Sequence, residues 1–345
     1  MHQPASVSIV VPAHHSGPVL NACLDSLAAL HPPPREIIIA IDGPDTSVHA
    51  AAASRGFQSI QLAHAPGVSA TRNAGAAAAS GQLILFIDSD IRVPTDLVLS
   101  ACRTLNSHPD ATAAFGSYDA TPAHQSLVSR YRNLLHHFTH QHANRNARTF
   151  WAGCGIIHRS TFLNSGGFDP RYRLPSIEDI DLGYRLTSAG HHIVLNPSWQ
   201  VCHLKPWRFA SMIRTDTLYR AYPWSLLILN TRRSADNDLN TDVRSRFSAI
   251  AAAIAALSFL IAPSHPASLT IAIPSLLLLW ILNRRFYTLL FLQGRLPLAT
   301  AGLLLHPLYF LCALSGYSLA HLASIRPHPP RQPTLSQPAS LPPPP

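Results

Sequence analysis

The chain has 345 residues, enough for one large domain or two ordinary ones, and combines 47% hydrophobic residues with only 12% charged ones. Its net charge of +9 is unevenly placed, because every Asp and Glu lies at or before Asp242 and the last hundred residues carry arginine as their only charged type. The sequence has neither a basic helix nor the arginine and aromatic repeat of an RNA-binding module, so it argues against a nucleic-acid partner and favours a membrane surface.

Between Val7 and Val201, short apolar runs typical of strands alternate with longer helical runs. The strand-like runs are VSIVVP, EIIIAIDG, SIQLAH and LILFIDSD. This alternation predicts βαβ units and a mostly parallel α/β sheet. Because such sheets bind ligands beyond the carboxyl ends of their strands, Asp42 and the pair Asp88 and Asp90 are candidate binding residues.

The pair of aspartates ends a buried strand, in LILFIDSDIRVP. Two carboxylates one residue apart repel each other unless a cation lies beside them, and Mg²⁺ or Mn²⁺ typically joins such oxygens to substrate phosphates. A solvated turn is the alternative, since Asp and Ser are ordinary turn residues. A phosphatase of the haloacid dehalogenase type also ends a strand in DxD, but normally continues into Thr or Val, whereas Ile91 follows here.

The segment GVSATRNAGAAAASGQLILFIDSDIRVPTDLV, with VSIVVPAHH and AIDGPDTS upstream, resembles the inverting family 2 glycosyltransferases over about residues 7–206. The resemblance implies a GT-A nucleotide-sugar-binding fold and transfer of a sugar from a nucleotide-diphosphate-sugar, most commonly a UDP-sugar. In that family the strand-end aspartates hold the metal and the diphosphate of the donor. The cofactor it implies is Mn²⁺ or Mg²⁺.

On the donor side, the resemblance places Pro12 and Ala13 against the base and ribose. Asp42 takes the place of the aspartate that hydrogen-bonds the base, although the usual DDGS is shortened here to IDGP. Arg72, in TRN, is expected to face the nucleotide or its phosphates. A surface ion pair at the start of a helix is the alternative for this arginine.

Three residues form the metal site that the resemblance implies. Asp88 is expected to bind the ribose or the metal, Asp90 to ligate the metal directly, and His203, in WQVCHLKP, to be a third ligand. The histidine pairs at 14–15, 136–137 and 191–192 are interpreted as incidental.

On the acceptor side, FWAGCGIIHRSTFLNSGGFDPRY resembles the family's acceptor wall, with Gly153 and Gly155 permitting close backbone approach. The segment SIEDIDLGYRLTSAG carries the family's ED motif at Glu178 and Asp179. We expect Asp179 to act as general base, supported by Glu178, with inversion at the anomeric carbon. The alternative is an acidic first turn that complements a helix dipole. Because KPWRFASMIR replaces the QxxRW of processive members, single-sugar transfer is expected.

After Asp242, Phe247 to Asn283 is a run of residues without a charge, interrupted by PSHP at 263–266, and Leu296 to Ile325 is another. These runs predict membrane helices, with buried helices of a soluble protein as the alternative. Flanking arginines, and an N-terminus without a signal peptide, predict that the catalytic domain is cytoplasmic. The expected parts are a glycosyltransferase domain (1–222), an interfacial segment (223–246), a membrane anchor (247–325, with spans at 247–262, 267–283 and 298–320) and a disordered proline-rich tail (326–345).

The stretch RFASMIRTDTLYRAYPWSLLIL contains Arg208, Arg214 and Arg220 among aromatic residues, just ahead of the first expected span. It is interpreted as an interfacial helix that meets anionic headgroups, or as an ordinary positive-inside flank. The chain is therefore expected to be a multi-pass protein of the cell inner (plasma) membrane. The expected acceptor is a lipid or lipid-linked glycan at the cytoplasmic face of that membrane. Two alternatives stay open: a membrane-bound nucleotidyltransferase and a catalytically inactive nucleotide-binding scaffold.

Overall fold

The computed structural model describes residues 6–231, 239 and 241–325, so the predicted disordered tail lies outside the described residues. A single mixed sheet runs in the order β3-β2-β1-β4-β8-β6-β9-β5, with β7 paired beside β9. The strands are β1 (Val7–Ala13), β2 (Glu36–Ile41), β3 (Gln58–Gln61), β4 (Leu83–Ile87), β5 (Ile91–Arg92), β6 (Ala111–Tyr118), β7 (Asn146–Ala147), β8 (Cys154–His158) and β9 (His192–His203).

The first four strands form the parallel part of the sheet, since β1 pairs in parallel with both β2 and β4, and β2 with β3. Every residue of β1 and β4 is buried. This explains why their sequences are continuous apolar runs, because helices cover both faces of a parallel sheet. β8 then enters antiparallel between β4 and β6. The predicted mostly parallel α/β sheet is confirmed.

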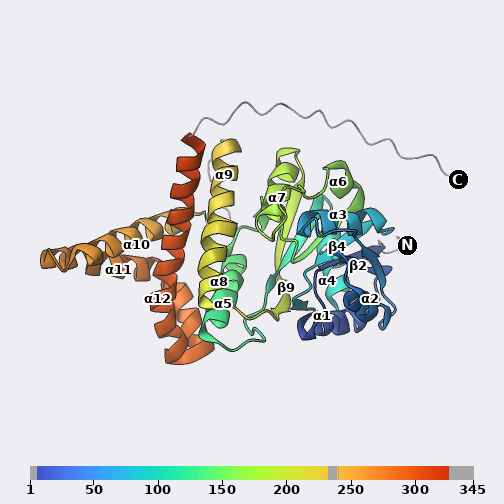
Figure 1. The fold of residues 1–345 in the computed structure, drawn as a ribbon, viewed down its shortest axis with the longest axis horizontal. Helices are drawn as coiled ribbons and strands as arrows, with labels where there is room; N and C mark the ends of the chain where they lie inside the picture. The colour runs from blue at the N-terminus through green and yellow to red at the C-terminus, as the bar shows by residue number, and fades with distance from the viewer. Residues whose placement is uncertain (1–5, 232–238, 240, 326–345) are drawn as a thin grey trace.

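Seven helices among the described residues flank this sheet. In Figure 1, α1 and α2 lie on one side of the parallel strands and α3 on the other. The chain therefore changes direction between β1 and β4, and such a switch point forms a crevice at the carboxyl ends of the two strands. The helices are α1 (Pro18–Ala28), α2 (Thr46–Ala53), α3 (Val68–Ala78), α4 (Leu97–Ser107), α5 (Leu127–His142), α6 (Arg159–Asn164) and α7 (Glu178–Ser188).

The rest of the described chain is helical. In Figure 1, α10 and α11 project away from the sheet as a pair, while α9 and α12 run side by side. Two helices, α10 and α12, are long and apolar enough to cross a membrane, and α12 is bent at Arg295. The elements are α8 (Phe209–Arg214), the π-helix η1 (Thr215–Ala221), α9 (Tyr222–Thr231), α10 (Val243–Ile261), the 3₁₀ turn η2 (Pro266–Ser268), α11 (Leu269–Leu282) and α12 (Arg284–Ile325).

A second apolar core joins α5 of the sheet domain to α12. Tyr131 and Phe138 of α5 pack against Phe286 and Leu290 of α12, and all four are buried. The hydroxyl of Tyr131 lies 3.0 Å from Nδ1 of His306, which is a hydrogen bond between the two parts of the chain. The sheet domain and the C-terminal helices therefore share a packed interface.

Candidate active site

A cavity of about 190 Å³ opens at the carboxyl ends of β1 and β4, and we call it the strand-end cavity. Asp42 is fixed in its wall, because its Oδ1 accepts hydrogen bonds from the amide of Gly67 and the hydroxyl of Thr71, both at 3.0 Å. The cavity is lined by all five residues predicted to bind the nucleotide-sugar: Pro12, Ala13, Asp42, Arg72 and Asp88.

A second cavity, of about 320 Å³, lies beside the first and is here called the central cavity. It contains both predicted catalytic residues and all three predicted metal ligands: Glu178, Asp179, Asp88, Asp90 and His203. The two cavities adjoin, since five residues line both: Arg72, Asp88, Asp90, Pro175 and Lys205.

Arg72 lies between the two predicted carboxylate groups rather than on the surface, and only 3% of it is exposed. Its Nη2 donates to Oδ1 of Asp88 at 2.6 Å and its Nη1 donates to Oε1 of Glu178 at 2.7 Å. The alternative of a surface ion pair is therefore wrong. The guanidinium thus joins the end of β4 to the start of α7.

Asp90 faces His203 at the border of the two cavities. Oδ2 of Asp90 lies 3.6 Å from Nε2 of His203, because β5 pairs with β9 and sets Ile91 opposite His203. The imidazole also stacks on Tyr118, with ring centroids 4.6 Å apart. Burial raises the pKa of Asp90, but the neighbouring His203 and Lys205 together outweigh burial and leave that pKa below its ordinary value.

The donor set fits a divalent cation that arrives with a diphosphate. Among the described residues, no group of three or more His, Cys, Asp and Glu side chains is close enough to hold a metal by itself. The carboxylate of Asp88 is engaged by Arg72, which leaves Asp90 and His203 facing each other. Mg²⁺ and Mn²⁺ are usually held by one or two protein ligands together with substrate phosphates, so this pair is sufficient for such a site.

Asp179 lies in the first turn of α7, where its Oδ2 accepts from the amide of Ala152 at 3.3 Å. Burial, followed by the negative charge of Glu178, raises the pKa of Asp179 to about 7. A carboxylate with such a pKa is suited to accept a proton near neutral pH. The position and the raised pKa of Asp179 are thus compatible with the prediction that it is a general base close to Asp88 and Asp90.

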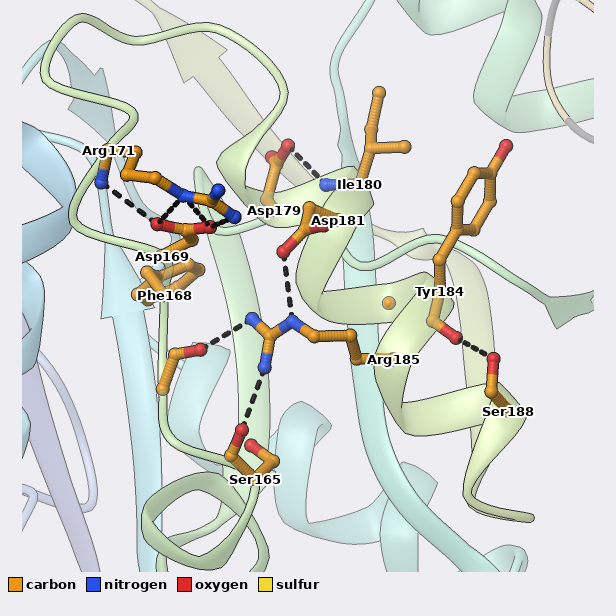
Figure 2. Close-up of polar contacts among 12 residues, drawn as sticks. Ser165, Phe168, Asp169, Arg171, Asp179, Ile180, Asp181, Tyr184, Arg185 and Ser188 are labelled. Carbon is orange, nitrogen blue, oxygen red and sulfur yellow. Dashed lines mark hydrogen bonds and ion pairs between the residues drawn. The ribbon is translucent and has the colours of Figure 1, made fainter. Parts of the chain in front are cut away.

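The helix that carries Asp179 is anchored by a separate set of contacts (Figure 2). Nε of Arg185 donates to Asp181 at 2.9 Å, and its two Nη groups donate to the carbonyls of Ser165 and Gly167 at 2.8 and 2.6 Å. Because these bonds fix α7 against the loop before it, Asp179 is held on a rigid element.

The glycines of the predicted acceptor wall are required by close packing. A Cβ on Gly153 would come within 2.6 Å of the indole of Trp151, and one on Gly155 would lie 2.5 Å from the ring of Phe150. Trp151 lines the central cavity. The carbonyl of Gly153 accepts a hydrogen bond from the amide of Asp88 at 3.0 Å.

A third cavity, of about 170 Å³, adjoins the central one at Asp179 and is here called the helix-lined cavity. Most of its wall comes from α5, α7, η1, α9 and α12, and the rest comes from β6, residues 149–151, Leu239 and Thr241. The two cavities share Arg132, His136, Trp151, Asp179 and Arg220.

Sequence reasoning missed most of these shared residues. His136 belongs to a histidine pair interpreted as incidental, yet it lines two cavities, and His14 of another such pair lines the strand-end cavity. Arg220 was expected on an interfacial helix with Arg208 and Arg214. Those two are exposed, but Arg220 is half-buried at the junction beside Asp179. The spacing of Arg220 from the neighbouring aromatic residues does not predict that it lies beside Asp179.

Comparisons with known proteins agree with this geometry. Residues 8–164 match the model of the family described as glycosyl transferase family 2. The chain is 25% identical over 239 residues to the O-antigen biosynthesis protein RfbC of Myxococcus xanthus, which covers 63% of this chain and 18% of that protein. It is 26% identical over 215 residues to the pre-mycofactocin glycosyltransferase of Mycobacterium tuberculosis, covering 57% and 42%. The chain thus spans less than half the length of these curated relatives.

A shorter match and one solved structure complete the comparison. The chain is 48% identical over 52 residues, or 15% of its length and 17% of the other, to an N-acetylglucosaminyl-diphospho-decaprenol L-rhamnosyltransferase of Mycobacterium tuberculosis. The fold resembles a mannosyltransferase of Pyrobaculum calidifontis, solved with GDP-Man and Mn²⁺, at a TM-score of 0.54 and 15% identity, covering 93% of this chain and 87% of that one. This similarity supports the GT-A fold.

Proposed function

Because residues 8–164 match the family model described as glycosyl transferase family 2, we propose that the protein is an inverting, metal-dependent enzyme that transfers one sugar from a nucleotide-diphosphate-sugar to a hydroxyl group. The observation that carries the proposal is the continuity of the cavities. The five predicted donor residues line one cavity, Asp179 lies in the next, and Arg72, Asp88 and Asp90 belong to both.

The donor occupies the strand-end cavity in this proposal, with its base and ribose near Pro12, Ala13 and Asp42. Asp90 and His203 would hold the metal, with Asp88 beside them, at the entrance to the central cavity. Bound Mn²⁺ or Mg²⁺ supplies positive charge that neutralises the departing diphosphate. A UDP-sugar is the donor we propose, since it is the common choice in the family.

Asp179 accepts the proton of the acceptor hydroxyl. The hydroxyl oxygen then bonds to the anomeric carbon, the bond from that carbon to the diphosphate oxygen breaks, and its electron pair leaves with the nucleoside diphosphate. Attack comes from the face opposite the leaving group, so the configuration inverts. Glu178 keeps Arg72 in place through its 2.7 Å ion pair and is not itself the base.

The C-terminal helices support anchoring in a membrane, as a multi-pass protein with the catalytic domain on the cytoplasmic side. Large apolar side chains on them lie open, including Leu260 at 76% and Leu304 at 77% exposure. Arg244 and Arg246 lie in the first turn of α10, and Arg284 and Arg285 follow shortly after α11, as the positive-inside rule requires of cytoplasmic ends. An acceptor in the same membrane, a lipid or lipid-linked glycan, follows from that location.

Two other hypotheses receive less support. A nucleotidyltransferase needs a cation in the loop after the first strand, and PAHHSGP has neither lysine nor arginine. A scaffold without activity has no need of an ionisable carboxylate such as Asp179 in a cavity next to the strand-end aspartates. Turnover of a nucleotide-sugar by the purified protein would exclude both hypotheses.

Replacement of Asp90 tests the metal and the donor together. The full-length protein in detergent is titrated with UDP-, GDP- and dTDP-sugars in Mn²⁺, Mg²⁺ or EDTA. We expect one donor to bind only with metal, and Asp90→Ala to reduce its binding to the level left by EDTA. Asp110→Ala, which changes an exposed carboxylate paired with His192, is the matched control. Donor binding that ignores both metal and Asp90 would exclude the proposed metal site.

The pH dependence tests Asp179. A base must be ionised, and the pKa of Asp179 is raised to about 7, so kcat/KM is expected to fall as the pH is lowered through about 7 and to level off above it. Since the charge of Glu178 contributes to that elevation, Glu178→Gln should move the acidic limb to lower pH while keeping an acceptor for Arg72. A limb that does not move in this variant contradicts the assignment.

A further inference from the structure

The junction of the central and helix-lined cavities carries unbalanced positive charge. Arg132 of α5 pairs with Asp216 of η1, Nη2 to Oδ1 at 2.7 Å, and both side chains are buried. That pair leaves Arg220, four residues after Asp216, with no carboxylate within 4.0 Å in the part of the chain that the structure describes. Two arginines therefore meet Asp216 and Asp179 where the cavities join, and among the described residues only Asp216 forms an ion pair with one of them.

The π-helix explains why Asp216 does not pair with Arg220. In an α-helix, Asp and Arg four residues apart lie on the same face and attract each other. The segment Thr215–Ala221 is instead a π-helix, a form that is rare and concentrated at functional sites. Here the carboxylate of Asp216 is directed to Arg132, and the guanidinium of Arg220 lines the junction.

The other groups at the junction do not neutralise the positive charge of Arg132 and Arg220. Nε of Arg132 is buried without a hydrogen-bond partner among the described residues. Burial lowers the pKa of His136 well below its ordinary value, so that ring is neutral and adds no charge. Burial and the nearby Arg132 also lower the pKa of Arg220, a repulsion that a bound anion would relieve. Asp179 is the remaining acid at the junction and serves as the base.

Beyond the two arginines the helix-lined cavity becomes apolar. Trp224 and Ile228 of α9 and Ala313 of α12 line it, with Tyr309 beside them. Tyr309 and Ala313 lie within the proposed membrane anchor, and α9 precedes it in the chain. The cavity thus offers cationic donors next to Asp179 and hydrocarbon contacts behind them.

We propose that the helix-lined cavity is the acceptor site and that it takes a phosphate-bearing amphiphile, whose phosphate binds Arg220 and Arg132 while its reacting hydroxyl lies at Asp179. The inference rests on the proposed function and adds the chemical class of the acceptor. Guanidinium groups suit phosphate because they donate several hydrogen bonds in one plane. The hydrocarbon part of the acceptor lies along α9 and α12.

The test uses three soluble probes on the full-length protein in detergent: octyl phosphate, octanol and inorganic phosphate. Binding is followed by tryptophan fluorescence, since Trp151 and Trp224 line the cavity. Octyl phosphate is expected to bind more tightly than either other probe, and Arg220→Ala to weaken it by roughly 10- to 100-fold. Arg220→Lys should restore part of the loss, and Arg103→Ala, an exposed arginine of α4, should change nothing.

Each opposite outcome has a distinct meaning. If inorganic phosphate binds as tightly as octyl phosphate, the cavity is a site for free anions. If octanol binds as tightly as octyl phosphate, the cavity is merely apolar. Either result would overturn the proposal. Loss of UDP or GDP binding with Mn²⁺ in Arg220→Ala would assign that arginine to the donor instead. Failure of the unaltered protein to bind any nucleotide-sugar would refute the proposed function, which the octyl phosphate titration does not measure.

Discussion

Asp179→Asn is expected to lower kcat by about 10²- to 10⁴-fold, the usual contribution of a general base. Asparagine has nearly the same shape and keeps a side-chain oxygen for the amide of Ala152, which donates to Asp179 at 3.3 Å. The fold and the donor site should therefore remain intact. We expect the dissociation constant of the nucleotide-sugar, measured with Mn²⁺, to stay within about twofold, which separates loss of chemistry from loss of binding.

Asp181→Asn is the matched control, because it makes the same chemical change two residues along α7. Asp181 pairs with Arg185 at 2.9 Å and does not line the three cavities described above (Figure 2). Turnover in this control should remain near that of the unaltered enzyme. If both variants lose activity equally, disturbance of α7 would explain the result and Asp179 would not be the base.

Two features could be predicted from the sequence: the GT-A fold, and the position of Asp88 and Asp90 close to the end of β1. Continuous apolar runs define β1 and β4, so Asp88 and Asp90, which follow β4, must lie at the same edge of the parallel sheet as the end of β1. Local pattern was sufficient here because each strand and its terminal residues are adjacent in the chain.

His203 needed more than local pattern, since 20 histidines are present and Asp90 lies more than a hundred residues away. Its position in the order of family motifs selected it. The structure brings the two together through the antiparallel pairing of β5 with β9, a contact between a two-residue strand and the end of a long one. No periodicity in so short a strand predicts that pairing.

The junction around Arg132 and Arg220 could not be predicted, because it depends on tertiary contacts between helices distant in sequence. The sequence TDTLYRA has the spacing of an ordinary helical ion pair between Asp216 and Arg220. Only the packing of η1 against α5 and α12 reveals a π-helix and a different partner for Asp216. When several helices together form the wall of a cavity, the sequence of a single helix does not reveal that the cavity exists.

Arg72→Met is expected to destabilise the protein by about 3–5 kcal/mol, the usual effect of removing one partner from a buried ion pair. Arg72 is 3% exposed and bonds Asp88 and Glu178 at 2.6 and 2.7 Å. Without the guanidinium, the buried carboxylate of Glu178, which is 4% exposed, and the carboxylate of Asp88, which is 29% exposed, both lose their partner. The unfolding midpoint of the detergent-solubilised protein should fall by roughly 10 °C, measured by circular dichroism.

A triple variant separates this charge effect from the loss of packing. Asp88→Asn and Glu178→Gln remove both uncompensated charges, so adding them to Arg72→Met should recover most of the midpoint, since neutral replacement of a whole buried ionic group costs little. The triple variant should nevertheless bind the donor poorly, because Asp88 lines the strand-end cavity. If it unfolds as easily as Arg72→Met alone, the arginine stabilises the fold by filling space, and its link between β4 and α7 is not electrostatic.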